Sequence, residues 1–342
     1  MDTPHAKDRS LGVAMIGVGH WGANVVRAAA GAARCRLRYL CDSDPATLAS
    51  QAKRYPQAVA TPDLNTVLAD PAVDAVLIAT EAPRHYAVAA AALDAGKHVF
   101  VEKPMTLSAA DAQRLIDKAA AGGRKLMVGH LLEHHPAFEL IRDMIHAGRI
   151  GDIYYMYTQR LNLGIVRKDE NAWWSLAPHD ISVICRLFEA QPTTVSATGQ
   201  CYLQPGVEDV VFATLKFGDG RLAAIHVSWL DPHKTRHMTI VGKHNMITWN
   251  DMAPAEPVRV YDKSARAPGI ASYAESISLR TGDIVIPRVP GGEPLAREVG
   301  HFVDACLDDR PILTDGADGL RVVRVLEAGQ RSLAAGGRPV EV

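Results

Sequence analysis

The chain has 342 residues, which is too long for one ordinary hydrophobic core and fits two domains, or one large α/β body with a second lobe. Hydrophobic residues make up 48% and charged residues 22%, and 37 basic against 38 acidic side chains leave a formal net charge of -1. This balance excludes a strong electrostatic field, so we expect no nucleic-acid partner and no membrane partner.

The N-terminal segment and the cysteines indicate a cytoplasmic protein. The start, "MDTPHAKDRSLGVAMIG", holds no apolar run of signal-peptide length, and the run "VDAVLIAT" is far below the roughly 18 to 20 residues that span a bilayer. The five cysteines are scattered and form no CxxC pair, which is what a reducing cytosol permits.

Short β-branched runs alternate with alanine-rich helical segments over the first part of the chain. This alternation predicts βαβ units and a parallel sheet. The expected strands are residues 13–16, 37–41, 75–78, 98–101 and 125–128, and the expected helices are 21–33, 46–55, 85–95 and 108–121.

The pattern changes after Gly129. A helix over 136–147 precedes a strand whose even positions, from Met156 to Asn162, share one face. Short turns join the strands that follow, which predicts mostly antiparallel pairing. These strands are 194–202, 210–217, 222–229, 238–241, 246–249 and 258–262, with a loop over the surface or the cleft expected over 263–283 and closing helices over 295–307 and 319–335.

Gly17, Gly19 and Gly22 stand directly after a predicted strand and at the start of a predicted helix. The first makes a tight turn, the second lets the backbone approach a pyrophosphate, and the third allows the helix to pack closely on the strand. The helix N-terminus then offers unpaired N–H groups to the phosphates. With His20 and Trp21 of the same loop, these glycines are the expected contacts to a dinucleotide.

Asp42 ends the second predicted strand, twenty residues after Gly22. A carboxylate there can accept hydrogen bonds from both ribose hydroxyls, whereas the 2′-phosphate of NADP would face Asp42 and Asp44 together. The sequence therefore favours NAD as the cofactor. Thr80 and His85 follow a central strand at the edge where ligands bind, so we expect them to line the same crevice.

Glu102, Lys103 and Pro104 follow the next strand, at the same carboxyl edge of the sheet as the glycine loop. Proline fixes its own φ and restricts the residue before it, so the lysine is aimed rather than free. A nearby cationic nicotinamide and partial burial would both favour the neutral amine that a base requires. The alternative is a surface lysine paired with Glu102.

The segment "NAWWSLAPHDIS" predicts a helix that begins near Pro178, because proline suits the first turn and Asp180 suits the positive end. Ile181 and Ile184 belong to an apolar stripe that faces a core. His179 projects about 160° away from that stripe, so it faces either water or a cleft.

These motifs together, with "GRIG" at 148–151 and the late "PHD", resemble the Gfo/Idh/MocA family of NAD(P)-dependent oxidoreductases over nearly the whole chain. The resemblance implies an α/β fold with an N-terminal Rossmann domain, a doubly wound parallel sheet, over residues 1–128. It implies a C-terminal α+β domain over 129–342, built on a mostly antiparallel sheet through which homodimers or homotetramers form. It also implies that Lys103 and His179 are the catalytic residues.

Within the family, the second half is similar to nucleotide-sugar dehydrogenases that oxidise the 3-hydroxyl of a UDP-linked amino sugar. The expected reaction is proton abstraction by Lys103, assisted by His179, while a hydride passes from the carbinol to NAD. Arginine suits a carboxylate or phosphate and tryptophan a sugar ring, although core packing is the alternative for at least one tryptophan. The candidate substrate contacts are Arg160, Asn162, Asn171, Trp173, Trp174 and Ser175.

Two residues depart from the family pattern. Ser175 stands four residues before His179 where relatives carry aspartate, and Glu81 stands where they commonly have proline. A serine can hydrogen-bond an imidazole or a sugar hydroxyl, but it cannot stabilise imidazolium by charge. Lys103 is therefore expected to carry more of the proton transfer.

No metal site is expected. His233 and His237 are four apart, but their surroundings predict strand and turn, and "HLLEHHP" at 130–136 is equally weak. Two alternative functions stay open. One is an inositol or aminocyclitol dehydrogenase, and the other is a cofactor-binding homologue with altered or lost turnover, which Ser175 keeps in view.

Overall fold

The computed structural model describes residues 9–164, 166–167, 170–266 and 278–342, which form two compact units. The first unit runs to His134 and also includes Gly292–Val323, and the second comprises His135–Gly291 and Arg324–Val342. The sequence predicts a single second domain over residues 129–342. The structure instead groups Gly292–Val323 with the first unit, because the helix there packs on the first unit's sheet.

The first unit contains a six-stranded parallel sheet in the order β3-β2-β1-β4-β5-β6, as expected for a Rossmann domain. Its strands are β1 (Leu11–Ile16), β2 (Cys35–Cys41), β3 (Val59–Thr61), β4 (Ala75–Ile78), β5 (His98–Glu102) and β6 (Leu126–Gly129). Its helices include α1 (Gly22–Gly31), α2 (Pro45–Arg54), α3 (Leu64–Ala69), α4 (Ala82–Asp94), α5 (Ala109–Ala121) and α8 (Pro294–Asp308), with a short 3₁₀ turn η1 (Leu131–His134).

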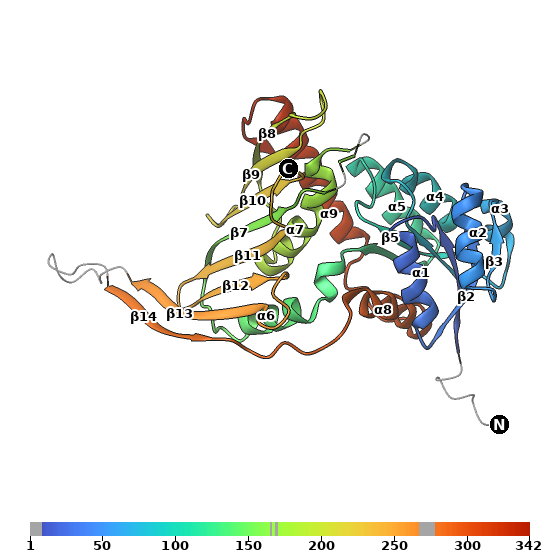
Figure 1. Cartoon of the computed structure of the whole chain (residues 1–342), viewed down its shortest axis with the longest axis horizontal. Coiled ribbons are helices and arrows are strands. Elements are labelled where there is room, and N and C mark those ends of the chain that lie inside the picture. The colour runs from blue at the N-terminus through green and yellow to red at the C-terminus, as the bar shows by residue number, and fades with distance from the viewer. Residues whose placement is uncertain (1–8, 165, 168–169, 267–277) are drawn as a thin grey trace. The chain divides into compact units, whose positions relative to one another are not determined.

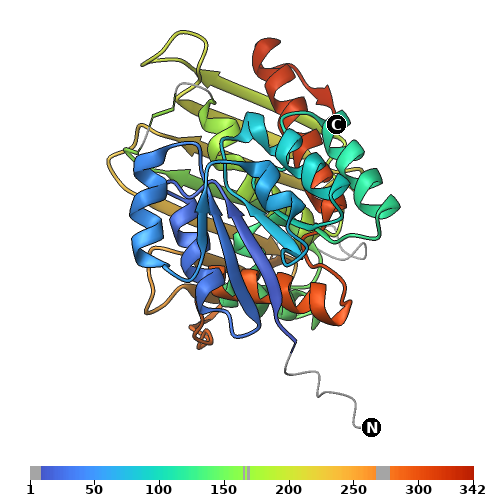
Figure 2. The ribbon, with the colours of Figure 1, turned by 90° about the vertical axis from the view of Figure 1, so that its right-hand side faces the viewer.

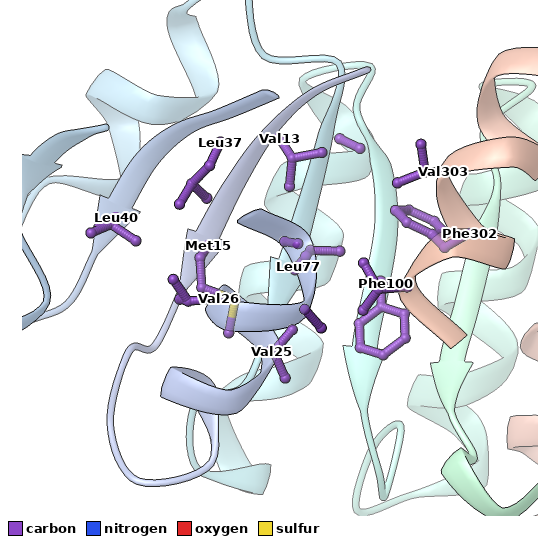
Figure 3. Packing of buried hydrophobic residues seen from close by; sticks show 14 of the residues in the cluster. Val13, Met15, Val25, Val26, Leu37, Leu40, Leu77, Phe100, Phe302 and Val303 are labelled. Carbon is purple, nitrogen blue, oxygen red and sulfur yellow. The ribbon is translucent and has the colours of Figure 1, made fainter. Parts of the chain in front are cut away.

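The sheet is covered by helices on both faces because successive residues of each buried strand point to opposite sides (Figure 2). Val13 and Met15 of β1 pack with α1 and α8, whereas Ala14 and Ile16 pack with α4 and α5. Figure 3 shows the first of these layers, in which Phe100 of β5 meets α8. The two layers explain why the strands read as continuous apolar runs.

The prediction of an α/β fold with a parallel sheet is confirmed. The five expected strands and four expected helices of this unit are present, with shifts at their ends. The additional β3 and α3 were missed because each is very short. Val59 and Ala60 of β3 are exposed, and the apolar positions Leu64, Val67 and Leu68 of α3 span little more than one helical turn.

The second unit is built on a nine-stranded, mostly antiparallel sheet in the order β14-β13-β12-β11-β7-β10-β9-β8-β15 (Figure 1). Strand β7 pairs in parallel with β10 and antiparallel with β11. The strands are β7 (Ile153–Leu161), β8 (Thr194–Gln200), β9 (Val210–Lys216), β10 (Leu222–Ser228), β11 (Thr235–Gly242), β12 (Met246–Asn250), β13 (Val258–Arg266), β14 (Ser278–Val285) and β15 (Val340–Glu341).

One predicted loop is partly a hairpin. The expected surface loop over 263–283 supplies the end of β13 and most of β14, which pair antiparallel. The residues between them, 267–277, lie outside the described part of the chain. The prediction of a loop was wrong at both ends because pairing with a neighbouring strand satisfies the backbone of a segment whose side chains are mostly small and polar.

The remaining helices are α6 (Pro136–His146), α7 (Ala172–Phe188) and α9 (Gly316–Ala334), the last of which passes from the first unit into the second at Val323. Helix α7 packs on β7, β9 and β10 of the sheet. Within the described ranges, we find no helix whose length and apolar composition would let it cross a bilayer.

Helix α7 begins earlier than the sequence predicted. Its N-cap is Asn171, whose side chain accepts a hydrogen bond from the Trp174 amide, and Pro178 lies inside the helix rather than in its first turn. The prediction failed because the burial of Trp173 and neighbouring apolar residues holds the preceding turns in the helix despite the hydrogen bond that proline removes.

Candidate active site

The glycine loop connects β1 to α1 with almost no space around two of its glycines. Gly17 has φ +84, and a Cβ there would stand 2.7 Å from the Ala79 carbonyl oxygen. A Cβ on Gly22 would stand 2.0 Å from the Gly17 carbonyl oxygen, so the helix can start this close to the strand only with glycine. Both residues are required by the fold of the loop itself.

Gly19 differs from its two neighbours. A Cβ built on it meets no protein atom within 4 Å, and its φ lies outside the left-handed region. The protein's own packing therefore does not require glycine at this position. Space beside the start of a helix, where the helix dipole favours negative charge, fits a pyrophosphate, so the residues present fit a dinucleotide cofactor. His20 and Trp21, in the same loop, are exposed.

Asp42 lies just after β2 and holds the glycine loop in place. One of its carboxylate oxygens accepts a hydrogen bond from the Val18 amide at 2.8 Å, and the other accepts from the Asp44 amide at 2.9 Å. The carboxylate is only partly buried, so it can accept further hydrogen bonds from a ligand. Asp44 in turn caps α2 through the Ala46 and Thr47 amides.

A substitution at Gly19 separates cofactor binding from folding. We expect Gly19→Ala to leave the melting temperature unchanged, because its Cβ meets nothing, and to weaken NADH binding by about tenfold or more, because the Cβ occupies the approach to the helix N-terminus. Fluorescence titration with NADH measures the loss. Gly31→Ala, whose Cβ at the end of α1 also faces open space, is the matched control and should change neither quantity appreciably. Unchanged NADH affinity in Gly19→Ala would contradict the assignment.

Glu102, the last residue of β5, links the glycine loop to the turn that carries Lys103. Trp21 Nε1 donates to Glu102 Oε1 at 2.6 Å, and the Lys103 amide donates to Oε2 at 3.3 Å. Burial raises the pKa of Glu102, while the hydrogen bond from Trp21 and the charge of Lys103 oppose the rise. The glycine loop and the turn that carries Lys103 are therefore tied through one buried carboxylate.

His85, on α4, lies between two turns at the same edge of the sheet. Its ring is 1% exposed, with Nδ1 2.8 Å from the Pro104 carbonyl oxygen and Nε2 3.0 Å from the Thr80 carbonyl oxygen. Burial lowers the pKa of His85, so a neutral ring donates to one carbonyl at a time. The buried ring fixes the position of these two turns, and the predicted contact of His85 with the cofactor stays a prediction. Thr80 itself is partly exposed.

In the second unit, Arg160 of β7 forms a buried ion pair with Asp180 of α7. Arg160 Nε donates to Asp180 Oδ2 at 2.9 Å and Nη2 donates to Oδ1 at 3.3 Å, with side-chain exposures of 11% and 5%. The predicted substrate residue Arg160 is thus held by a partner that the sequence analysis assigned only to the helix dipole. In the sequence, the only sign of this ion pair is that the charged Asp180 stands among the apolar residues of α7.

Asn171 and Trp174, both predicted substrate contacts, meet at Gln330. The side-chain nitrogen Nδ2 of Asn171 donates to Glu208 Oε2 at 2.6 Å and to Gln330 Oε1 at 2.9 Å. Trp174 Nε1 donates to the same Gln330 oxygen at 3.2 Å. Asn171 therefore stabilises the start of α7, and its part in substrate binding stays a prediction. Sequence analysis did not single out Glu208 or Gln330, because nothing in the linear pattern joins residues so far apart.

Trp173 is a core residue, as the alternative for one of the two tryptophans anticipated. Its side chain is 0% exposed, and its Nε1 donates to the Leu326 carbonyl oxygen at 3.0 Å. A Cβ on Gly329 would stand 2.5 Å from the indole ring, so α9 approaches this ring through a glycine. Trp174 is partly exposed and is the tryptophan available to a ligand.

His179 and Ser175 lie one turn apart on α7, so they share one side of that helix. His179 is half-buried, in agreement with its predicted position away from the apolar stripe, and Ser175 is buried at 6% exposure. Asn162 follows β7 and is also partly exposed. Its backbone N–H donates to the Ser228 carbonyl oxygen at 3.2 Å.

His237, one of the histidines that raised the question of zinc, lies beside Tyr157. His226 of β10 stacks on Phe212 with ring centroids 4.0 Å apart. Burial lowers the pKa of both histidines. In the part of the chain that the structure describes, no group of three or more His, Cys, Asp or Glu side chains has the arrangement needed to hold a metal ion.

The geometry of the first unit defines a class of protein. A glycine turn, an acid after the second strand and a lysine after the fifth strand all lie at the carboxyl edge of one parallel sheet, which is how dinucleotide-dependent oxidoreductases are built. Residues 11–130 match the oxidoreductase family with an NAD-binding Rossmann fold, and residues 138–248 match its C-terminal domain. The chain belongs to this Gfo/Idh/MocA family.

Known relatives cover nearly the whole chain. UDP-N-acetylglucosamine 3-dehydrogenase of Acidithiobacillus ferrooxidans is 30% identical over 90% of this chain and 93% of its own length. An inositol 2-dehydrogenase of Rhizobium meliloti is 24% identical over 94% of this chain and 96% of its own. The crystal structure of GenD2 from gentamicin A biosynthesis, in complex with NAD, superposes with a TM-score of 0.82 at 25% identity, covering 98% of this chain and 97% of that one. The predictions of family, fold and NAD as cofactor are confirmed.

Proposed function

We propose that the protein transfers a hydride between NAD and a secondary hydroxyl of a sugar, the 3-hydroxyl of a nucleotide sugar in the preferred case. The observation that carries the proposal is the position of Lys103 directly after β5, tied through Glu102 to the loop that receives the cofactor. The choice of a nucleotide sugar is supported by the 30% identical UDP-N-acetylglucosamine 3-dehydrogenase.

Lys103 is the proposed base. When bound, the nicotinamide accepts the hydride from the carbinol carbon. Lys103 Nζ takes the proton from the hydroxyl oxygen, so that the oxygen keeps the electrons that form the carbonyl. The Pro104 carbonyl oxygen lies 2.8 Å from His85 Nδ1, and this contact ties the turn that carries Lys103 to α4.

His179 is the proposed second catalytic group, contributed by α7. A half-buried imidazole can exchange a proton with a sugar hydroxyl, and Ser175 can hydrogen-bond either the ring or the substrate. Because a serine lacks charge, it leaves the main proton-accepting role to Lys103. Arg160, Asn162, Asn171 and Trp174 are the proposed substrate contacts of the same unit, with the partly exposed Trp174 as the face for a sugar ring.

A substrate panel tests the proposal against its alternatives. We expect reduction of NAD with UDP-linked amino sugars and a much lower rate with the free sugars, because the nucleotide contributes binding energy that the free sugar lacks. Full activity with free inositol and none with nucleotide sugars would favour the cyclitol alternative, for which the inositol 2-dehydrogenase relative is the supporting observation. No oxidation or reduction of NAD(H) with any of these, although NADH binds, would favour a homologue with lost turnover.

We also propose that the protein acts in the cytoplasm as a homodimer or homotetramer formed through the sheet of the second unit. The support is an exposed apolar surface on that sheet, where Tyr155, Tyr157 and Phe212 are 44%, 37% and 53% exposed. Beside them lies a hollow of about 500 Å³ whose walls include His226 and Thr198. Patches of this kind mark interfaces more often than free surfaces, and the mass of the particle in solution tests the proposal.

A further inference from the structure

Glu102 is the junction of the cofactor site. Its carboxylate is 7% exposed, and each of its oxygens accepts one hydrogen bond, from Trp21 Nε1 and from the Lys103 amide. A carboxylate that accepts two N–H groups is favoured in its charged form. Burial raises the pKa of Glu102, whereas these two N–H groups favour its charged form, and in that form the carboxylate holds the residue before α1 and the turn after β5 together.

The neighbouring strand makes room for this carboxylate. Gly129, the last residue of β6, pairs with Glu102, and a Cβ on it would stand 3.0 Å from Glu102 Oε2. Any larger side chain at this position would press on the carboxylate and shift it. The position of Glu102 is thus set from the side of β6 as well as by its hydrogen bonds.

A second buried acid lies on α8, which packs on the face of the sheet that carries Glu102. The ring of Phe302, one turn after Glu298, lies 5.9 Å from the ring of Phe100, two residues before Glu102 on β5. Glu298 is 0% exposed, and among the residues that the structure describes neither of its carboxylate oxygens has a hydrogen-bond partner. Burial, and then the charges of Glu102 and Glu133, raise the pKa of Glu298 well above its ordinary value of 4.5. Of the two acids, Glu298 is the one without donors, so it is the one that keeps a proton.

Other titratable groups lie on or next to β5, η1 and α8. Lys103 follows β5, Glu133 and His134 are part of η1, and His301 lies one turn after Glu298 on α8. The rings of His134 and His301 are 5.3 Å apart, and burial lowers the pKa of His301. The charges of Glu102 and Glu133 thus disfavour the charged form of the buried Glu298.

We propose that Glu298 is a positioning residue for the cofactor site, which carries a proton at neutral pH and thereby lets Glu102 keep its charge and its hold on Trp21 and the Lys103 turn. Glu298 touches neither substrate nor the reacting atoms in this role. The inference rests on the proposed function only where it concerns Lys103, since its effect on Trp21 and on NADH binding does not depend on the substrate.

The role of the proton gives a signed pH dependence. An acid whose pKa is higher in the folded than in the unfolded chain stabilises the fold fully below its ordinary value of 4.5, and this contribution is lost as the pH rises through the raised pKa. Loss of the proton also places a second negative charge beside Glu102. Both effects require an ionisable group at position 298, so Glu298→Gln removes them.

The first test is spectroscopic. At neutral pH, the infrared difference between the wild type and Glu298→Gln should contain the carbonyl stretch of a protonated carboxylic acid. In Glu102→Gln, which removes a facing negative charge, this band should disappear at a lower pH than in the wild type. Absence of the band, or an unchanged titration in Glu102→Gln, would overturn the proposal.

The second test measures cofactor binding without substrate. At alkaline pH we expect the NADH affinity of the wild type to fall about tenfold relative to that of Glu298→Gln, and Trp21 emission, obtained by subtraction of Trp21→Phe, to change with it. Asp117→Asn, an exposed acid on α5, is the control and should follow the wild type. Glu298→Ala should bind NADH more weakly than the wild type, and Glu298→Gln, the conservative variant, should restore the affinity.

Identical pH dependence of NADH affinity in the wild type and Glu298→Gln would overturn the proposal. Loss of sugar turnover with these differences intact would instead count against the proposed function.

Discussion

Replacement of Lys103 by methionine is expected to lower kcat by about 10²- to 10⁴-fold, the range that a positioned acid or base contributes. Methionine keeps an apolar stem of similar length and removes the ammonium. The hydrogen bond to Glu102 comes from the Lys103 backbone amide, which the substitution retains, so the link to Trp21 persists. NADH affinity should therefore stay within a factor of a few, and single-turnover kinetics with stopped-flow NADH detection separate the two quantities.

A matched control is Lys118→Met on α5, which removes a surface ion pair with Asp94 and should leave both kcat and NADH affinity unchanged. The pH dependence of kcat adds a second criterion. A rate that requires a neutral lysine rises with pH as the lysine loses its proton, and this rise should be absent in Lys103→Met. If hydride transfer in Lys103→Met continued near the wild-type rate, the assignment of Lys103 would be wrong.

Removal of Asp180 is expected to cause the largest loss of stability among the substitutions considered. Asp180→Ala leaves the Arg160 guanidinium at 11% exposure without its carboxylate, and breaking one side of a buried pair costs about 3 to 5 kcal/mol. For a domain of 150 to 250 residues this corresponds to a fall in melting temperature of roughly 10 °C. Differential scanning calorimetry measures the fall.

A double substitution separates stability from substrate binding. Arg160→Met with Asp180→Leu removes both charges and should recover most of the lost stability, because an apolar pair of similar volume avoids the desolvation cost. If Arg160 also contacts substrate, the double variant stays impaired in KM although it is stable. A melting temperature in Asp180→Ala equal to that of the wild type would show that the ion pair contributes nothing to folding.

Elements with a strong periodic pattern could be predicted from the sequence. The βαβ order and the α1 boundaries followed from β-branched runs, glycines and alanine-rich segments, which act within a few residues of each other. The start of α7 could not be predicted from Pro178, because the turns before it are held by the burial of Trp173 against Gly329 of α9, far away in the sequence. The β13–β14 hairpin likewise depends on pairing rather than on local composition.

The candidate site divides in the same way. Gly17, Gly19, Gly22 and Asp42 were predicted because each has a task in one short segment, and the structure places them at one edge of the sheet. The bond from Trp21 to Glu102 joins residues 81 positions apart, and no local pattern predicts it. His85 was expected beside the cofactor, yet its ring is enclosed between two backbone carbonyls.

The sequence alone therefore determined the class of fold, the glycine turn, the preference for NAD and the residue types that the reaction needs, because these depend on local spacing and chemistry. Only the tertiary structure decided which buried charges meet. Arg160 of β7 pairs with Asp180 of α7, and Glu298 of α8 interacts with Glu102 of β5. Such pairs form because a buried charge must be matched or neutralised by whatever packing brings near it, and that neighbour is set by the whole fold.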